Sequence, residues 1–569
     1  MESKIWHIIP NHFRAKGVGV SITIFVRALL NFAGLAALLP VLYLILDTEN
    51  LHSNAIIHKI YETLGFESDQ HFVIGVAVAV VLFIIAKSAI NILLYRVERD
   101  YTYSLYRHLS RKLFISYFKR GLQFIKGENS AVLSRNVNIV CYTFVMGILR
   151  SLATIASEVL LLLMILISIA IYSPLGALLA MAVFAVVAYI YFVMMRARLD
   201  SYGTLENEAQ RRKQRDVIEC FRGFADIEIN NAFGNQLTRF DNELDTIIKV
   251  GRKNATISML PQNLTEIGLA VGISLLLCIG TLLGSGDMKI LFGVFAVAGF
   301  RLLPSARNIM NAWSALRYNR YTIDILRNAD IAGEEAEEAE NRETLPFNET
   351  IEVRNLSFRF EEGANDTIHN LSLTIRKGEK VGINGESGVG KTTLLNLLLG
   401  LYSPTEGAIL IDGKALDSTF RRKWQNSIGY VSQNTFLSDN TIVANIAFGC
   451  EENEIDLERI DAVIKAASLS EFVASLPKGV HTRIGECGAL LSGGQRQRIG
   501  IARALYKRAD ILFFDEATSS LDSTTEQSIN RAIEHLSASN KELTIVVVAH
   551  RESSLDYCDR IITLEKNEQ

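Results

Sequence analysis

The chain has 569 residues, a formal net charge of −3, 49% hydrophobic residues and a mean hydropathy of +0.21. This length exceeds what one hydrophobic core usually serves, so more than one domain is expected. No basic stripe is present, so no nucleic-acid partner is expected. The six cysteines contain no C-x-x-C pair, which argues against a disulfide framework or a zinc site. The apolar excess lies in residues 17–312, and the remainder has the composition of an α/β domain.

Six apolar stretches are long enough to span a bilayer, which takes about 20 residues per helix. Turn-like sequences at 173–176 and 284–287 would join the third to the fourth span and the fifth to the sixth as helical hairpins. The predicted transmembrane domain covers residues 1–330, with spans at 18–46, 71–95, 144–172, 175–195, 262–284 and 288–312.

Basic residues are concentrated before span 1 and after spans 2 and 4, whereas the connection 47–70 contains one lysine. The positive-inside rule therefore places both chain ends in the cytoplasm. The two inner loops have breaks at 126–130 and 220–226, where short transverse helices can lie. A helix is also predicted at 55–66, either in the membrane interface or packed on the bundle.

Ionisable side chains inside a bilayer are costly, so each is a functional candidate. Glu158 and Glu266 are expected to pair with basic residues, and Arg27 and Arg150 are available partners.

Lys87 and Arg301 are different, because each lies well within its span and together they offer positive charge to an anionic substrate. Snorkelling of the two side chains toward the membrane surface is the alternative interpretation.

An acidic linker, 331–348, precedes a predicted nucleotide-binding domain at 349–569. Residues 385–392 read GESGVGKT and fit the pattern G-x-x-x-x-G-K-[ST] between a strand-like and a helix-like segment. Glycines there turn backbone N–H groups toward a polyphosphate, the lysine reaches the terminal phosphates, and the threonine hydroxyl can bind magnesium. The predicted ATP-binding residues of this segment are Gly385, Glu386, Ser387, Gly388, Val389, Gly390, Lys391, Thr392 and Thr393.

Residues 511–516 read ILFFDE, an apolar strand that ends in two carboxylates. Asp515 is suited to hold Mg²⁺, and Glu516 is suited to act as the general base that polarises an attacking water.

With these motifs in this order, the whole chain resembles an ABC transporter half-transporter of the exporter type. The resemblance implies a six-helix α-helical transmembrane domain followed by an α/β P-loop ABC ATPase domain that hydrolyses ATP with Mg²⁺. It also assigns further residues to the nucleotide site, namely Phe360, Gln433, Ser492, Gly493, Gly494, Gln495, Asp522 and His550.

By this resemblance Phe360 stacks on adenine, Gln433 contacts Mg²⁺ and the attacking water, and His550 contacts the γ-phosphate. Glu516, His550 and Gln433 are thus the predicted catalytic residues, and Thr392, Gln433 and Asp515 the predicted metal ligands. The signature at 491–495 (LSGGQ) and the interface loop around Asp522 act across two chains. The resemblance therefore implies a homodimer whose inner loops contact the ATPase domains.

A narrower resemblance, to the bacterial lipid-linked oligosaccharide flippases, is carried by residues 299–309, Lys87 and the outer helix at 55–66. It implies that a polyprenyl-pyrophosphate glycan is moved from the cytoplasmic to the outer leaflet of the bacterial inner membrane. Residues 261–263 lack an arginine that the family offers. A multidrug or general lipid exporter is the alternative, and an ATP-gated channel or regulatory membrane ATPase is less favoured.

Overall fold

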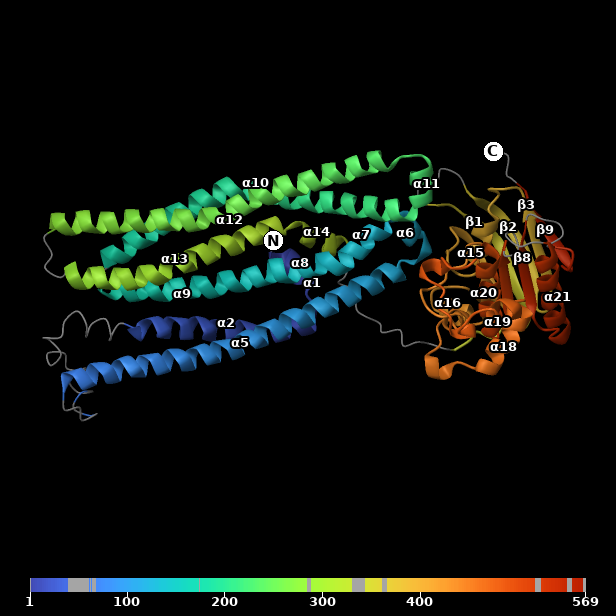
Figure 1. Ribbon diagram of the computed structural model, residues 1–569, viewed down its shortest axis with the longest axis horizontal. Coiled ribbons are helices and arrows are strands. Elements are labelled where there is room, and N and C mark those ends of the chain that lie inside the picture. The colour runs from blue at the N-terminus through green and yellow to red at the C-terminus, as the bar shows by residue number, and fades with distance from the viewer. Residues whose placement is uncertain are drawn as a thin grey trace. The chain divides into compact units, whose positions relative to one another are not determined.

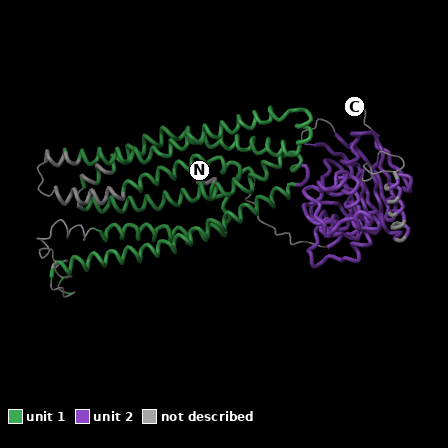
Figure 2. Tube along the Cα trace, in the orientation of Figure 1, with its two compact units in different colours: residues 1–120, 124–335 green, residues 121–123, 336–569 purple. Residues whose placement is uncertain are grey.

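The protein is described by a computed structural model that covers residues 2–38, 61, 63, 68–172, 174–283, 288–329, 343–360, 366–516, 523–549 and 555–565. The chain folds into two compact units, which Figure 2 shows in two colours. The first comprises residues 1–120 and 124–335, and the second comprises 121–123 and 336–569. The predicted outer helix, apart from residues 61 and 63, and most of the acidic linker lie outside the described residues.

Six long helices build the described part of the first unit, and each overlaps one of the six predicted spans. Figure 1 shows α10 beside α12, α9 beside α13, and α2 beside α5. The long helices are α2 (Asn11–Ala36), α5 (Asp69–Lys119), α9 (Arg150–Tyr172), α10 (Pro174–Arg222), α12 (Phe233–Leu283) and α13 (Met288–Tyr318). The short ones are α1 (Glu2–Ile8), α6 (Gly121–Gly127, of which residues 121–123 are counted with the second unit), α7 (Ser130–Arg135), α8 (Cys141–Thr143), α11 (Phe224–Ile229) and α14 (Tyr321–Asn328), with π-helical segments η2 (Asn136–Val140) and η3 (Phe144–Leu149).

Many apolar side chains of these helices point outward, as in a protein whose solvent is lipid. On α5, Ile74, Leu82 and Ile85 are each 60% exposed. Within the described residues, four helical stretches are long and apolar enough to cross a membrane: Asn11–Ala36, Gln70–Lys119, Ser130–Ile171 and Met181–Arg222. Such stretches satisfy their backbone hydrogen bonds internally, as the hydrocarbon core requires.

The two predicted breaks in the inner loops coincide with short helices. In the first loop α6 ends at Gly127, and Asn129 caps α7 by accepting a hydrogen bond from the Ala131 N–H at 2.9 Å. In the second, α11 joins α10 to α12 at the end of their hairpin (Figure 1). That these helices contact an ATPase domain stays a prediction.

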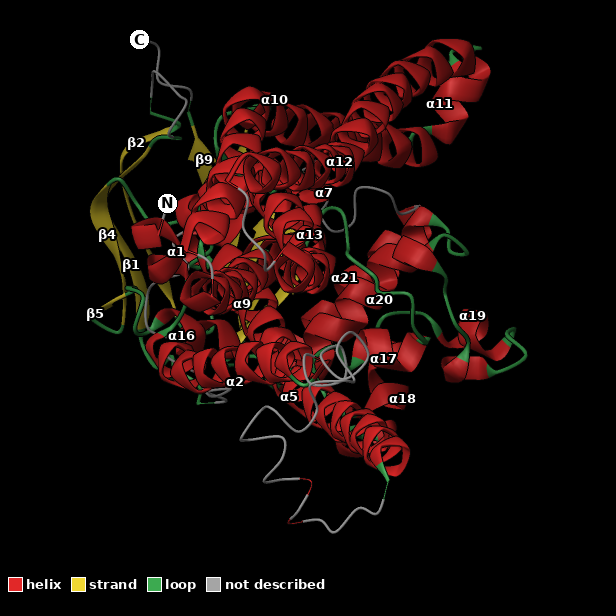
Figure 3. Ribbon diagram, turned by 90° about the vertical axis from the view of Figure 1, so that its left-hand side faces the viewer, coloured by secondary structure: helices red, strands yellow, loops and turns green. Residues whose placement is uncertain are grey.

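The second unit contains two sheets. An antiparallel sheet has the order β2-β1-β4-β5, and a parallel sheet has the order β6-β7-β8-β3-β9. Figure 3 shows β1, β2, β4 and β5 grouped along one side. The strands are β1 (Thr350–Phe358), β2 (Ile368–Arg376), β3 (Lys380–Gly385), β4 (Glu406–Ile411), β5 (Lys414–Ala415), β6 (Ile428–Val431), β7 (Ile511–Asp515), β8 (Thr544–Val548) and β9 (Arg560–Leu564).

Helices pack against the parallel sheet and bury its centre. All five residues of β7 and all five of β8 are buried, which explains why both read as continuous apolar runs. The helices of this unit are α15 (Lys391–Leu398), α16 (Arg421–Asn426), α17 (Ile442–Ile446), α18 (Leu457–Ala466), α19 (Ser470–Ala474), α20 (Gly493–Tyr506) and α21 (Ser523–Ser539), with 3₁₀ turns η4 (Glu452–Glu454), η5 (Gly479–His481) and η6 (Glu486–Gly488). The predicted fold class, a helical membrane domain followed by an α/β P-loop domain, is confirmed.

Candidate nucleotide-binding site

The glycine-rich loop runs from the carboxyl end of β3 to the start of α15. Gly385, Gly388 and Gly390 have φ of 150°, 83° and 104°, values that side chains disfavour. A Cβ on Gly390 would also lie 3.0 Å from the Thr367 carbonyl oxygen. The loop can therefore take this path only with glycine at these positions. It leads directly into a helix N-terminus, which favours an anion.

Lys391 is held over this loop rather than extended into solvent. Its Nζ donates to the carbonyl oxygens of Gly385 at 2.6 Å and Glu386 at 2.9 Å. Burial lowers the pKa of Lys391, while Glu516 and Asp515 raise it. The ammonium thus lies close enough to both carboxylates to sense their charge, although they are more than a hundred residues away in sequence.

Asp515 is the last residue of β7 and Glu516 follows it, and β7 is separated from β3 by β8 alone. Asp515 is buried, with 4% exposure. Glu516 has φ of +49°, and its N–H donates to the Val548 carbonyl oxygen at 2.9 Å. The Gln433 Nε2 donates to Glu516 Oε2 at 2.7 Å, which orients the carboxylate. The parallel sheet therefore brings the P-loop, both acids and Gln433 to one edge, as predicted for ligand sites of α/β folds.

These residues fit a magnesium ion that is shared with a nucleotide. Mg²⁺ prefers oxygen ligands and is usually bound by one or two protein oxygens together with phosphates. Thr392 and Asp515 supply a hydroxyl and a buried carboxylate at this edge, and Gln433 supplies an amide oxygen. In the described part of the chain no cluster of three or more His, Cys, Asp or Glu residues could hold a metal alone.

Phe360, the predicted adenine-stacking residue, lies two residues beyond the end of β1 and is 36% exposed. Its ring packs edge-on against the rings of Phe358 and Tyr402, with distances between ring centroids of 5.0 Å and 5.8 Å. Phe358 and Tyr402 are stacked on each other at 5.2 Å. The sequence analysis did not single out these two supporting rings, because nothing in their spacing distinguishes them from core aromatics.

The signature segment opens α20 with a capping box. The Ser492 N–H donates to Gln495 Oε1 at 2.8 Å, and the Gln495 N–H donates to Ser492 Oγ at 3.2 Å. This pairing occupies the serine hydroxyl and the glutamine amide, while Gly493 and Gly494 form the first turn. The N-terminus of α20 is thereby fixed as a second anion-favouring helix end.

Two predicted site residues, Asp522 and His550, lie outside the described residues. Arg301 lies on α13, and its side chain is likewise not among those described. Lys87 lies on α5 and faces α2, since a Cβ built on Gly34 would approach its Nζ to 2.8 Å. The two predicted substrate residues thus stay predictions.

The remaining charged residues of the spans pair differently from the expectation. Arg27 does pair with an acid, but with Glu98, at 2.6 Å between Nη1 and Oε2. That acid was missed because it lies just beyond the predicted end of span 2. Glu158 accepts hydrogen bonds from Ser305 at 2.7 Å and Asn308 at 2.8 Å rather than from a basic residue.

Glu266 accepts a hydrogen bond from Gln262 at 3.3 Å, and Arg150 donates to the Tyr95 hydroxyl at 3.4 Å. The described partners of Glu158 and Glu266 are therefore neutral polar groups, and their pairing with a basic residue stays a prediction. Neutral polar groups on neighbouring turns or helices satisfy a carboxylate at lower desolvation cost than a second charge.

A helical membrane unit fused to a P-loop domain with this signature defines an ABC-type half-transporter. Residues 368–519 match the ABC transporter family. This segment of the second unit belongs to the ABC transporter family, and the chain has the domain order of an exporter-type half-transporter.

Comparison with known proteins gives the same class. The chain is 33% identical over 352 residues to an ATP-dependent lipid A-core flippase of Cupriavidus pinatubonensis, covering 61% of this chain and 59% of that protein. A protein of the same name from Syntrophus aciditrophicus is 36% identical over 337 residues. The alignment covers 58% of this chain and 54% of that protein. The chain thus aligns with little more than half the length of these relatives.

The fold also matches a solved structure, that of a bacterial Atm1-family ABC exporter with ATP bound. The match covers 97% of this chain and 93% of that chain, with a TM-score of 0.75 and 24% sequence identity. At this identity the match shows a shared fold.

Proposed function

We propose that the chain works as a homodimeric, ATP-hydrolysing translocase of the bacterial inner membrane that moves an amphipathic lipid from the cytoplasmic to the outer leaflet. The observation that carries this proposal is the assembly of Lys391, Asp515, Glu516 and Gln433 at one sheet edge of a chain that also carries the apolar helices. The relatives named as lipid A-core flippases support a lipid as the substrate.

The chemistry proposed for this edge is phosphoryl transfer to water by positioning and charge stabilisation. Glu516, oriented by Gln433, takes the proton of the attacking water. Lys391 leaves its loop carbonyls to contact the terminal phosphates, and the P-loop N–H groups hold the rest of the triphosphate. Bound Mg²⁺ would supply charge neutralisation at the phosphates through Thr392 and Asp515. Gln433, Asp522 and His550 complete the proposed site together with a second chain's signature.

The finer proposal is that the substrate is a lipid-linked oligosaccharide whose pyrophosphate meets Lys87 and Arg301. An anion is favoured because charged residues within membrane spans are rare and commonly mark a substrate pathway. A multidrug or general lipid exporter is the second candidate. An apolar cavity in the first unit favours it, because such a cavity can hold an uncharged apolar molecule. This cavity of about 210 Å³ is lined by residues of α9, α10, α12 and α13, including Phe184, Phe192 and Leu302.

The experiment is ATP-dependent movement of a fluorescent polyprenyl-pyrophosphate glycan between the leaflets of proteoliposomes. Glu516→Gln should abolish movement of any substrate. Lys87→Gln and Arg301→Gln should slow movement of the pyrophosphate lipid while ATPase activity persists. Arg107→Gln, at an exposed position of α5, is the control. Unchanged movement in both substrate variants would refute the glycan-lipid site and leave the ATPase assignment intact.

A further inference from the structure

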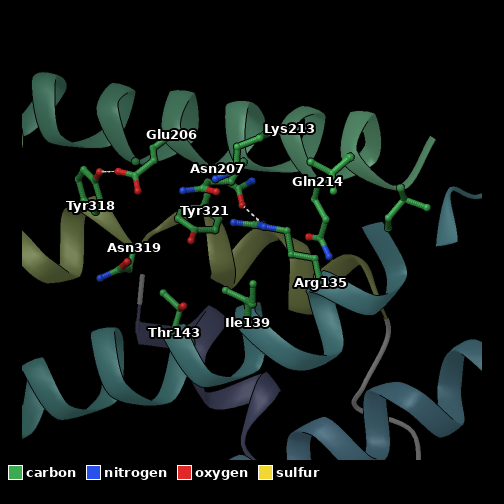
Figure 4. Close-up of a pocket in the computed structure, with 14 residues that line it drawn as sticks. Arg135, Ile139, Thr143, Glu206, Asn207, Lys213, Gln214, Tyr318, Asn319 and Tyr321 are labelled. Atoms are coloured by element: carbon green, nitrogen blue, oxygen red, sulfur yellow. Dashed lines mark hydrogen bonds between the residues drawn. The ribbon is translucent and has the colours of Figure 1, made fainter. Parts of the chain in front are cut away.

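A cavity of about 710 Å³ lies within the first unit, beyond the predicted spans. Its lining comes from three places: the segment from Arg135 to Thr143, the part of α10 from Gly203 to Ile218, and residues 318–321 at the junction of α13 and α14. Figure 4 shows α10 on one side and the 135–143 segment on the other. The lining positions on α10 recur at helical spacing over 15 residues, so the cavity extends about 20 Å along the helix.

A buried guanidinium is the central polar group. Arg135 is only 4% exposed, and its Nη1 donates to Asn207 Oδ1, as Figure 4 shows. Burial is the main cause that lowers the pKa of Arg135, and interaction with Tyr321 opposes it. Arginine nevertheless stays protonated at neutral pH. Lys213 lines the same cavity and adds a second cation.

One acid, Glu206, belongs to the lining residues. It accepts a hydrogen bond from the Tyr318 hydroxyl (Figure 4), and burial raises its pKa, with Arg135 opposing. Two cations therefore face one carboxylate whose charged form is disfavoured, and the lining is positive. At the C-terminal end of the α10 residues that line the cavity, Val217 and Ile218 offer apolar surface.

We propose that this cavity binds a soluble amphipathic anion from the cytosol. A carboxylate or phosphate would lie at Arg135 and Lys213, with an apolar body along Ile139, Val217 and Ile218. A cavity of this size, mostly apolar with a few placed polar groups, is typical of small-molecule sites. This site is additional to the nucleotide site and to the lipid pathway of the proposed function.

Its position separates the ligand from the membrane. Residues 206–218 follow the predicted end of span 4 by 11 to 23 residues, or about 15–35 Å of helix. A headgroup anchored by its tail in the bilayer is poorly placed to reach them, whereas a soluble molecule enters from the cytosol. Because three segments line the cavity, a bound ligand would hold them together and modulate their movement.

The test is isothermal titration calorimetry on the full chain in detergent micelles, with saturating Mg-ADP to occupy the nucleotide site. The probes are phenyl phosphate, benzoate, inorganic phosphate and phenol. We expect phenyl phosphate, benzoate or both to bind at least about tenfold more tightly than inorganic phosphate and phenol. Preference between the first two identifies the phosphate or the carboxylate as the preferred anion.

Lys213→Gln should weaken that binding about tenfold, as should Val217→Asp, whereas Lys249→Gln, an exposed lysine of α12, should not. Lys213 and Val217 are only partly buried, so these variants avoid the folding risk of Arg135→Gln. Equal binding of all four probes, or binding that both cavity variants leave unchanged, would overturn the proposal. Since no turnover is measured, such a result leaves the translocase proposal untouched.

Discussion

At the scale of single residues, Glu516 shows how backbone and side chain cooperate. A positive φ is uncommon for glutamate, yet the backbone N–H is tied to β8 and the carboxylate to Gln433 at 2.7 Å. Strained backbone of this kind persists where the surroundings fix it, and it is frequent at functional sites. These two contacts therefore orient the carboxylate.

The corresponding prediction concerns Glu516→Gln. The amide cannot take a proton from water, so ATP hydrolysis should fall by about 10²- to 10⁴-fold, the usual contribution of a general base. ATP binding should persist, because Lys391 and the loop are unchanged. Phosphate release and nucleotide binding, measured on the same preparation, separate these effects.

Glu542→Gln is the matched control, since Glu542 is 78% exposed and forms a surface ion pair with Lys377. Such pairs contribute little. If Glu516→Gln and Glu542→Gln hydrolyse ATP equally fast, Glu516 is not the base.

At the scale of elements, α2 and α5 are joined by a polar seam, defined here as three contacts along their antiparallel interface. Arg27 pairs with Glu98, and Asn31 accepts from Asn91 at 3.0 Å. Gly34 then lies against the side chain of Lys87. The positions advance by four and three residues on α2, so they share one helix face. The seam fixes the register of the first two membrane helices.

The prediction for the seam is a double-mutant cycle. The Arg27 and Glu98 side chains are 17% and 11% exposed, so each single change, Arg27→Met or Glu98→Met, leaves a charge with little solvent. Each should destabilise the protein by about 3–5 kcal/mol, while the double variant recovers most of the loss. Thermal unfolding in detergent measures the four proteins.

The control is Arg107→Met, at an exposed position of α5, which should change the midpoint temperature of unfolding little. Additive losses in the double variant would show that the pair does not act as a unit.

At the scale of the whole molecule, the proposed active site combines the P-loop at the start of α15 in one chain with the signature at the start of α20 in a second chain, as the resemblance to exporter half-transporters implies. The exposed apolar residues around α11 fit the same arrangement: Phe221, Phe224 and Ile229 are 79%, 66% and 83% exposed. Apolar side chains that are this exposed gain free energy when a partner surface covers them. A second copy of this chain supplies one in the proposed dimer.

Mixing two inactive variants tests this. Lys391→Ala disables the P-loop, and Ser492→Arg blocks the signature, so each homodimer lacks both sites. In the heterodimer one site combines the intact P-loop of one chain with the intact signature of the other. Co-expression should restore roughly a quarter of the wild-type ATPase rate, since half of the dimers are mixed and each has one of two sites.

The two variants purified separately and then assayed alone provide the baseline. A mixture that is no more active than its components would contradict the shared site.

Local motifs predicted most of the nucleotide site, because its chemistry sits in short contiguous segments. The P-loop, the acids at the end of β7 and the signature each combine their residue types within a few positions, and the apolar pattern around them indicated strands and helices. Glu98, Asn91 and Tyr402 could not be found this way. Their roles depend on partners 60 or more residues away or on a ring that stacks from another element.

Contiguous residues alone predicted membrane-spanning helices and a P-loop ATPase domain, because hydrophobic length and phosphate-loop chemistry are properties of short segments, and the motifs in their order carried the resemblance to an ABC half-transporter. Which polar groups meet depends on packing between distant segments, and the sequence did not predict it. The tertiary structure paired Arg27 with Glu98, gave Glu158 neutral partners, and enclosed Arg135 in a positive cavity. The reason is physical: the cost of a buried charge depends on the atoms around it, and packing brings those atoms from distant parts of the chain.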